Sequence, residues 1–271
     1  EVVFHLAAQP LVRESYVTPV ETFSTNVQGT VHVLDACRRM AELKAVICVT
    51  SDKCYENNEW VWPYREADPM GGHDPYSASK GAAELVISAY RRSFFENGPL
   101  LASVRAGNVI GGGDWAKDRL IPDIVRSLIA GAMPLIRSPG AVRPWQHVLE
   151  ALGGYLLIAG RLLEGQRWAA TPWNFGPADG DVQPVSWIAD RLTDAWGATG
   201  WERGEMAGPH EANILKLDCA KSRSILGWQP ALSLSEALHM IVNWHRPVAN
   251  GADPRDVTSS QLIEYRMKFQ T

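Results

Sequence analysis

The sequence predicts an α/β fold built on a doubly wound parallel sheet. Strand-like and helix-like segments alternate along the first two thirds of the chain, which is the order that such a sheet requires. The apolar run 45–49 is typical of a buried parallel strand, and it ends directly at the polar residues Thr50 and Ser51. Beyond Pro177 the pattern changes to separate amphipathic helices, which predicts a smaller, mostly helical second domain.

Short apolar segments predict strands at 1–5, 45–49, 100–104 and 173–177. Segments with helical periodicity predict helices at 18–39, 77–95, 144–163, 185–196 and 234–244. Thr18 and Pro19 open the first helix, since proline is favoured at the first helical position. The apolar stripes that we expect to face the sheet are Phe23, Val27, Val31 and Leu34 in the first helix and Ala82, Leu85, Val86 and Ala89 in the second.

The composition is that of an ordinary globular protein: of 271 residues, 46% are hydrophobic and 21% are charged. A net charge of −4 disfavours binding to nucleic acid or to an anionic membrane. No apolar run approaches the roughly 18 residues that span a bilayer. The four cysteines have no metal-binding spacing, which indicates reduced thiols in a cytoplasmic protein, and the histidines show no zinc pattern, so we expect no metal site.

Tyr76 and Lys80 are the first candidate functional pair. The spacing Tyr-x-x-x-Lys places both side chains on one face of a helix, one turn apart. A lysine cation favours the charged form of a neighbouring phenol, and a phenolate can remove the proton of a substrate hydroxyl. Taken alone, the same spacing fits a solvated helix equally well.

Ser51, Asp52 and Lys53 follow the predicted strand 45–49 directly, so they lie at its carboxyl end, where open α/β sheets bind ligands. Taken singly, Asp52 has a plain explanation as a turn cap, and Lys53 as a solvated cation. Together with Tyr76 and Lys80 they supply a hydroxyl, an acid and a second base. This combination indicates more chemistry than a hydride transfer alone requires.

These residues resemble those of the extended short-chain dehydrogenase/reductase superfamily and, within it, most closely the CDP-glucose 4,6-dehydratases. The resemblance extends over the first two thirds of the chain. It is carried by the segments 4–9 (FHLAAQ), 50–55 (TSDKCY), 57–66 (NNEWVWPYRE), 74–80 (DPYSASK), 105–115 (RAGNVIGGGDW) and 143–148 (RPWQHV). Related dehydratases of dTDP- and GDP-sugars usually place a glutamate where this chain has Lys53, so the resemblance implies CDP-glucose as substrate.

The resemblance also implies the residues of the site. The catalytic residues would be Ser51, Asp52, Lys53, Tyr76 and Lys80. The implied cofactor, NAD, would contact Leu6, Ala7, Ala8, Asn26, Tyr76 and Lys80. The nucleotide sugar would contact Gln9, Asn108, Arg119 and Arg143. Arginine suits a diphosphate because its guanidinium donates two parallel hydrogen bonds, and an amide both donates to and accepts from sugar oxygens.

In the implied reaction, Tyr76, assisted by Lys80 and Ser51, removes the proton of the glucosyl 4-hydroxyl while hydride passes from C4 to NAD. The resulting ketone acidifies the C5 hydrogen, which Lys53 removes, and Asp52 protonates the departing 6-hydroxyl as general acid. Hydride then returns to C6, so NAD is regenerated in each turnover. The division of roles between Asp52 and Lys53 stays open.

The glycine-rich dinucleotide fingerprint of such folds is missing from this chain. Residues 1–5 already correspond to the fourth strand, so we expect a Rossmann-type sheet that lacks its first strands, by roughly one or two βα units. The expected domains are 1–176, a partial NAD-binding domain with a substrate-contacting insertion at 113–143, and 177–271, a substrate-covering domain. The chain as given is expected to be inactive and to bind NAD poorly.

Two alternatives stay open. The first is another nucleotide-sugar dehydratase or an epimerase of the same superfamily; an epimerase would share Ser51, Tyr76 and Lys80, but it has no use for the adjacent Asp52 and Lys53. The second is a non-catalytic fragment or binding protein on a degenerate fold, which the missing fingerprint favours. Against that second alternative, the other catalytic positions are intact.

The resemblance further implies a homodimer that pairs through the predicted helices 19–39 and 77–95. It implies a cytoplasmic enzyme of deoxysugar biosynthesis that serves the lipopolysaccharide O-antigen. Trp60 and Trp62, in the segment that follows Tyr55, are expected to form a hydrophobic clasp rather than a lid.

Overall fold

The computed structural model describes residues 1–205 and 214–268, and the chain divides into two compact units. The described residues within 1–107, 152–176 and 209–229 form the first unit, and those within 108–151, 177–208 and 230–271 form the second. The units and the predicted domains share a boundary after residue 176. The predicted division into 1–176 and 177–271 stays a prediction, because each compact unit is assembled from separate stretches of chain.

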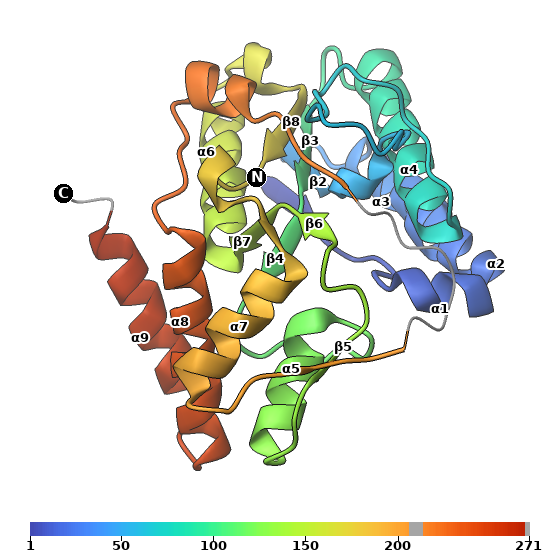
Figure 1. The fold of residues 1–271 in the computed structure, drawn as a ribbon. Helices are drawn as coiled ribbons and strands as arrows, with labels where there is room; N and C mark the ends of the chain where they lie inside the picture. Colours follow the sequence, from blue (N-terminus) through green and yellow to red (C-terminus); the bar gives the residue numbers. More distant parts are fainter. Residues whose placement is uncertain (206–213, 269–271) are drawn as a thin grey trace. The chain divides into compact units, whose positions relative to one another are not determined.

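The first unit is built on a four-stranded parallel sheet (Figure 1). In spatial order its strands are β1 (Val2–His5), β2 (Ala45–Val49), β3 (Leu100–Ala106) and β8 (Pro172–Phe175). Each coincides closely with a predicted strand. Every residue of β3 is buried, as expected for a strand inside a parallel sheet that helices cover on both faces. The predicted α/β fold with a doubly wound parallel sheet is confirmed.

Helices cover both faces of this sheet (Figure 1). They are α1 (Val12–Val17), α2 (Pro19–Phe23), α3 (Gly29–Cys37), α4 (Pro75–Ser93) and residues 152–163 of α6 (Val148–Leu163). The predicted helix 18–39 is confirmed as α2 and α3, joined by the wider π-helical turn Ser24–Gln28. Helix α1 was not predicted, because six residues are too few to show a helical period.

The predicted inward stripe of the first helical segment was partly wrong. Leu34 is fully buried, but Phe23 is 39% exposed. The residues that are buried with Leu34 are polar, namely Thr22, Asn26 and Thr30. Their side chains bond to the protein, as when the Thr30 hydroxyl donates to the carbonyl of Asn26 at 2.7 Å. Hydropathy therefore misassigned the face, because hydrogen-bonded polar groups line it.

The predicted inward face of α4 was also wrong in part, since Leu85 is 63% exposed. The buried row instead contains Tyr76, Lys80 and Glu84, which are spaced four residues apart. Side chains at this spacing share one face of a helix. The candidate catalytic pair therefore occupies the face that turns toward the sheet.

The described residues of the second unit form three short strand pairs, four helices and the first turn of α6. The pairs are β4 (Asn108–Ile110) with β7 (Trp145–His147), β5 (Leu135–Ile136) with β10 (Glu202–Arg203), and β6 (Val142–Arg143) with β9 (Gln183–Pro184). The helices are α5 (Leu120–Ile129), α7 (Val185–Trp196), α8 (Leu234–Ala249) and α9 (Pro254–Met267). Short helical turns also lie at Asp52–Cys54, Arg167–Ala169, Asp179–Asp181 and Ser222–Leu226.

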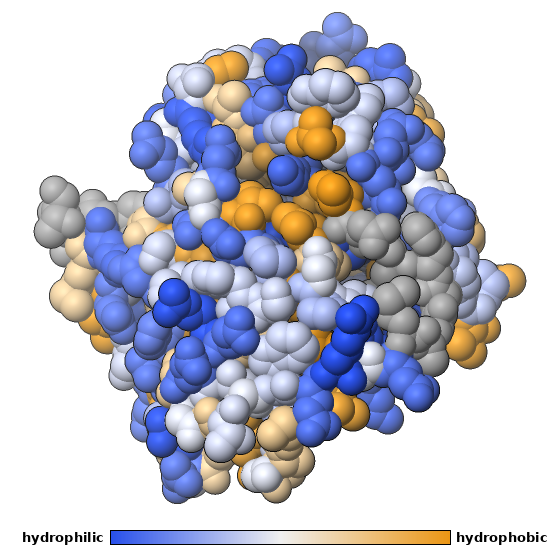
Figure 2. Space-filling view, in the orientation of Figure 1, coloured by the Kyte–Doolittle hydropathy of each residue, from blue (hydrophilic) through white to orange (hydrophobic). Residues whose placement is uncertain are grey.

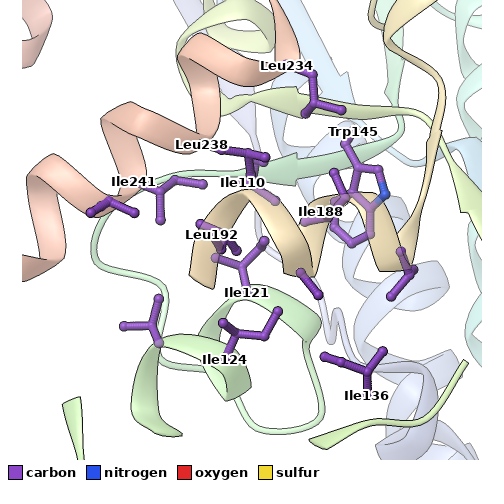
Figure 3. Close-up of a cluster of buried hydrophobic side chains, with 14 of the residues drawn as sticks. Ile110, Ile121, Ile124, Ile136, Trp145, Ile188, Leu192, Leu234, Leu238 and Ile241 are labelled. Atoms are coloured by element: carbon purple, nitrogen blue, oxygen red, sulfur yellow. The ribbon is translucent and has the colours of Figure 1, made fainter. Parts of the chain in front are cut away.

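The core of the second unit lies between α5, α7 and α8, with Trp145 at one side (Figure 3). Ile124, Ile188, Leu192 and Ile241 are almost fully buried within it. The start of the predicted helix 144–163 was wrong, because α6 begins only at Val148. Residues 145–147 pair with β4 as a strand instead.

Hydrophilic side chains cover much of the face shown in Figure 2, with hydrophobic residues in small groups between them. All four cysteines are free and buried, in agreement with the predicted reduced thiols. Within the described residues, no helix is both long enough and apolar enough to cross a membrane.

Two glycines of α6 provide a test of the packing in the first unit. A Cβ atom at Gly154 would overlap the ring of Phe175, whereas a Cβ atom at Gly160 would meet no atom within 4 Å. Gly154→Ala is therefore expected to lower the free energy of unfolding by about 1–3 kcal/mol. Gly160→Ala is expected to raise it by about 0.5–1 kcal/mol, because alanine is the better helix former. Urea denaturation of both variants measures these changes, and equal effects would contradict the assigned helix face.

Candidate active site

The polar turn after β2 is the first part of the site. Ser51 caps a single 3₁₀ turn, Asp52–Cys54: its Oγ accepts the N–H of Lys53 at 3.2 Å and donates to Asp52 Oδ1 at 2.9 Å. Asp52 is only 1% exposed, and its second oxygen, Oδ2, has no hydrogen-bond partner among the described residues. A buried carboxylate oxygen without a partner is uncommon, and it is a feature expected of a group that meets a ligand.

Helix α4 supplies the second part. The side chain of Asp74 accepts the N–H of Ser77 at 2.9 Å, and Pro75 occupies the first turn, so the helix begins just before Tyr76. The backbone N–H of Tyr76 donates to the buried Ser15 Oγ at 3.1 Å. Lys80 Nζ lies 6.0 Å from the centroid of the Tyr76 ring. The predicted juxtaposition of Tyr76 and Lys80 on one face is therefore present, and both side chains are buried.

A close backbone approach brings these two parts together. Gly81 follows Lys80, and a Cβ atom there would lie 2.9 Å from the carbonyl oxygen of Gly71 and 3.1 Å from that of Cys54. Those distances are too short for any side chain, so glycine is required. The 3₁₀ turn that bears Asp52 and Lys53 packs directly on α4 as a result.

Burial lowers the pKa of Lys80 to about 8, and the nearby Cys54, Glu84 and Cys48 oppose part of this shift. The pKa of His5 is also lowered, chiefly by burial and to a smaller extent by the charge of Lys80. His5 is the last residue of β1, so the carboxyl end of that strand lies near the ammonium group. The site thus holds one lysine whose charge changes just above neutral pH.

The segment after β1 is held against α4 by Asn26. Its Oδ1 accepts the N–H of Gln9 at 2.8 Å, and its Nδ2 donates to the Gln9 carbonyl at 3.0 Å and to Ser79 Oγ at 2.8 Å. The side chain of Gln9 bonds to Thr22 and Leu11. Asn26 therefore positions the segment that contains Leu6, Ala7 and Ala8. The ligand contacts predicted for these three residues, for Gln9 and for Asn26 stay predictions.

Three predicted substrate contacts belong to the second unit. Asn108 opens β4, and its buried Oδ1 has no hydrogen-bond partner among the described residues. Arg119 forms an ion pair with Asp114 at 2.9 Å. Arg143 is buried, and its Nη1 donates to the carbonyl of Val142 at 2.9 Å. The five predicted catalytic residues all lie in the first unit.

The sequence reading missed a buried polar network beneath the turn. Glu84 and Arg105 form an ion pair at 2.8 Å, with side chains only 4% and 3% exposed. Arg105 also donates to Tyr55 Oη at 2.7 Å, and that hydroxyl donates to Asn174 Oδ1 at 2.7 Å. Two signals were available: Arg105 is a charge inside an apolar strand, and Glu84 lies one helical turn beyond Lys80.

Comparison with known proteins identifies the family. The model of the "NAD dependent epimerase/dehydratase family" matches residues 1–169. The CDP-glucose 4,6-dehydratase of Salmonella typhimurium is 54% identical over 98% of this chain and 76% of its own length. The chain belongs to the NAD dependent epimerase/dehydratase family. The predicted family, its catalytic type and its NAD cofactor are thereby confirmed.

Other members of the family are more distant. The dTDP-glucose 4,6-dehydratase of Streptomyces antibioticus is 28% identical over 90% of this chain and 70% of its own length. A crystal structure of the dTDP-glucose 4,6-dehydratase of Streptomyces venezuelae, which contains NAD, is 26% identical and has a TM-score of 0.80. It covers 94% of this chain, and the match covers 76% of that chain. The fold of the family is therefore shared along almost all of the present chain.

The carboxyl end of β1 fits a bound NAD. Leu6 and Ala7 are exposed at the carboxyl end of β1, Leu6 at 52%, and this apolar surface lies next to His5 and Lys80. Ligands of open α/β sheets bind at that edge. Within residues 1–205 and 214–268, no three His, Cys, Asp or Glu side chains are close enough together to hold a metal ion.

The low pKa of Lys80 can be measured without any ligand. In an NMR titration, the Lys80 ammonium is expected to lose its proton near pH 8, against an ordinary value of 10.5. Because the unfolded chain keeps this proton up to the higher pH, the stability contributed by this group rises with pH between these two values. The signal should disappear in Lys80→Arg, which identifies it. A titration at the ordinary pH would contradict the burial of Lys80.

Proposed function

We propose that this protein is a CDP-glucose 4,6-dehydratase, which converts CDP-glucose to CDP-4-keto-6-deoxyglucose. The observation that carries the proposal is the buried turn with Asp52 and Lys53, packed on the helix face that bears Tyr76 and Lys80. A dehydratase needs an acid and a base in addition to the hydroxyl-activating tyrosine, and this arrangement contains both. The 54% identity to the Salmonella enzyme supports the same substrate.

In the first step Tyr76 removes the proton of the 4-hydroxyl. The Lys80 ammonium stabilises the phenolate, and the Ser51 hydroxyl would exchange its bond to Asp52 Oδ1 for a hydrogen bond donated to the reacting oxygen. Bound NAD would accept the hydride from C4 and later return it to C6. Because Tyr76 and Lys80 are buried, their interaction is weakly screened by water, which strengthens the effect of the cation.

In the second step Lys53 removes the C5 hydrogen and Asp52 protonates the leaving 6-hydroxyl. Asp52 fits the role of acid because one of its oxygens is buried and unpartnered among the described residues, so it can meet the substrate. Lys53 is half-buried, and its backbone N–H is bonded to Ser51, which fixes its position beside the acid. An epimerase would require neither group.

Gln9, Asn108, Arg119 and Arg143 are proposed contacts of the nucleotide sugar. The arginines suit its diphosphate, and Arg119 would exchange its bond to Asp114 for phosphate oxygens. Asn108 supplies an unpartnered carbonyl oxygen for a sugar hydroxyl. These roles follow from the chemistry of the side chains.

A homodimer and a cytoplasmic role in deoxysugar biosynthesis for the O-antigen stay predictions. The exposure of Val20 at 82% and of Leu85 at 63% supports pairing through α2 and α4, because an apolar surface on these helices is available to a second copy. Trp60 and Trp62 pack edge to face at 5.8 Å, and Trp60 stacks on Tyr64 at 5.4 Å, as expected for a hydrophobic clasp.

Substrate choice provides the direct test of the proposal. The natural full-length protein, supplied with equal concentrations of CDP-glucose, dTDP-glucose and GDP-glucose, is expected to consume the cytidine nucleotide first and to form a 4-keto-6-deoxy product. Equal turnover of all three would reject the predicted base preference. Formation of the 4-epimer without loss of water would instead show an epimerase.

Two variants are expected to fail at different steps. Tyr76→Phe removes the phenol and blocks the first oxidation, whereas Lys53→Met leaves oxidation intact and blocks elimination. Each should reduce turnover by roughly 10²–10⁴-fold, as for the loss of one proton-transfer group. Single-turnover absorbance should therefore show NADH in Lys53→Met but not in Tyr76→Phe.

Lys44→Met is the matched control, because Lys44 is an exposed lysine of the same unit. It should leave both steps unchanged. Normal exchange of the C5 hydrogen with solvent in Lys53→Met would exclude Lys53 as the base.

A further inference from the structure

The buried carboxylate of Glu84 has every oxygen engaged. Arg105 donates to it twice, from Nε to Oε1 at 2.9 Å and from Nη2 to Oε2 at 2.8 Å. Thr50 Oγ1 donates to Oε1 at 2.5 Å, and Ser103 Oγ donates to Oε2 at 2.9 Å. Burial alone would raise the pKa of this carboxyl, but the bonds and charge of Arg105, with the two hydroxyls, hold the pKa below its ordinary value. Glu84 is therefore ionised at neutral pH.

The ion pair holds both ends of the 3₁₀ turn. Thr50 comes immediately before Ser51, and its hydroxyl is bonded to Glu84. Tyr55 comes immediately after Cys54, and its hydroxyl receives a bond from Arg105 at 2.7 Å. The residues between these two anchors are Ser51 to Cys54, which include the proposed acid and base. The turn is thus fixed at both ends by one buried pair.

Glu84 also lies on the row of α4 that bears Tyr76 and Lys80. Its negative charge raises the pKa of Lys80 and so opposes part of the effect of burial. The titratable groups that face Lys80 are His5 from β1, Cys48 from β2, Cys54 from the 3₁₀ turn, and Tyr76 and Glu84 from α4 itself. Burial raises the pKa of both thiols far above neutral, so neither supplies a charge there.

We propose that Glu84 is a positioning residue of the reaction: through Thr50 directly, and through Arg105 and Tyr55, it holds the Ser51 to Lys53 turn in register with Tyr76 and Lys80. Its charge has a second effect, because it favours the protonated form of Lys80. This role rests on the proposed dehydratase function. It differs from a purely structural ion pair in that it alters the pH dependence of the reaction.

Glu84→Gln removes the charge and keeps the size of the side chain. In the natural full-length protein, turnover of CDP-glucose is expected to fall by about 10- to 100-fold, as when reacting groups are slightly misplaced. Lys80 loses its proton as pH rises, and without the Glu84 charge it does so at lower pH. The alkaline limb of the rate profile should therefore move down by about one pH unit.

Thr50→Val separates the two effects, because it breaks one bond to Glu84 and keeps the charge. Turnover should fall while KM and the alkaline limb stay in place. Glu150→Gln is the control for general destabilisation. Glu150 is 1% exposed and accepts the N–H groups of Ala231 and Leu232 in the second unit, so its loss should weaken the fold without moving the limb.

A ligand-free measurement keeps the two proposals distinct. NMR titration of Lys80 in Glu84→Gln and Thr50→Val should show a lowered pKa only in the former. If the unmodified protein does not turn over CDP-glucose, the proposed function fails, and the titration still decides the influence of Glu84 on Lys80. If Glu84→Gln cannot be purified folded, unchanged turnover in Thr50→Val rejects the positioning role. An unshifted limb and an unshifted Lys80 in folded Glu84→Gln also overturn it.

Discussion

The ion pair between Glu84 and Arg105 is the interaction on which the first unit depends. Neither charge has access to water, so each requires partners that replace its hydration. Glu84 obtains them from β3 and from Thr50, which directly follows β2, and Arg105 obtains them from α4, from Tyr55 and from the carbonyl of Glu66 at 3.0 Å. Removal of one partner would leave an uncompensated buried charge, which costs about 3–5 kcal/mol. The pair therefore joins strands and helix at the level where the polar turn begins.

The elements that the sequence predicted well are those specified by local pattern. The run 45–49 became β2 because five consecutive apolar residues suit a strand covered on both faces. Helix α4 was predicted over 77–95 from its helical periodicity, and it begins two residues earlier, at Pro75, where the Asp74 side chain caps it. The grouping of Ser51, Asp52, Tyr76 and Lys80 followed from the same two elements, since the carboxyl end of a strand and the first turn of the next helix are neighbours in this fold.

What the sequence missed depends on contacts between distant residues. Hydropathy placed Leu85 inside and overlooked Glu84, because no local pattern shows that Arg105, on another strand, would satisfy a buried carboxylate. Trp145 was assigned to a helix because its pairing with Asn108 joins residues far apart in the sequence. These errors share one cause: hydrogen bonds between distant residues override the periodic pattern of the sequence, as expected where a site is built inside a core.

Two buried carboxylates of the first unit, Glu84 and Asp52, differ in how their oxygens are bonded. The Glu84 carboxylate accepts four hydrogen bonds from neighbouring side chains and has no free position to accept another. Asp52 is equally buried, yet its Oδ1 is bonded to Ser51 and its Oδ2 has no partner among the described residues. A group left unsatisfied in this way destabilises the fold unless a ligand completes it. Glu84 and Arg105 hold the residues at both ends of the turn, so the turn as a whole cannot move Asp52 out of the core without breaking the bonds at Thr50 and Tyr55.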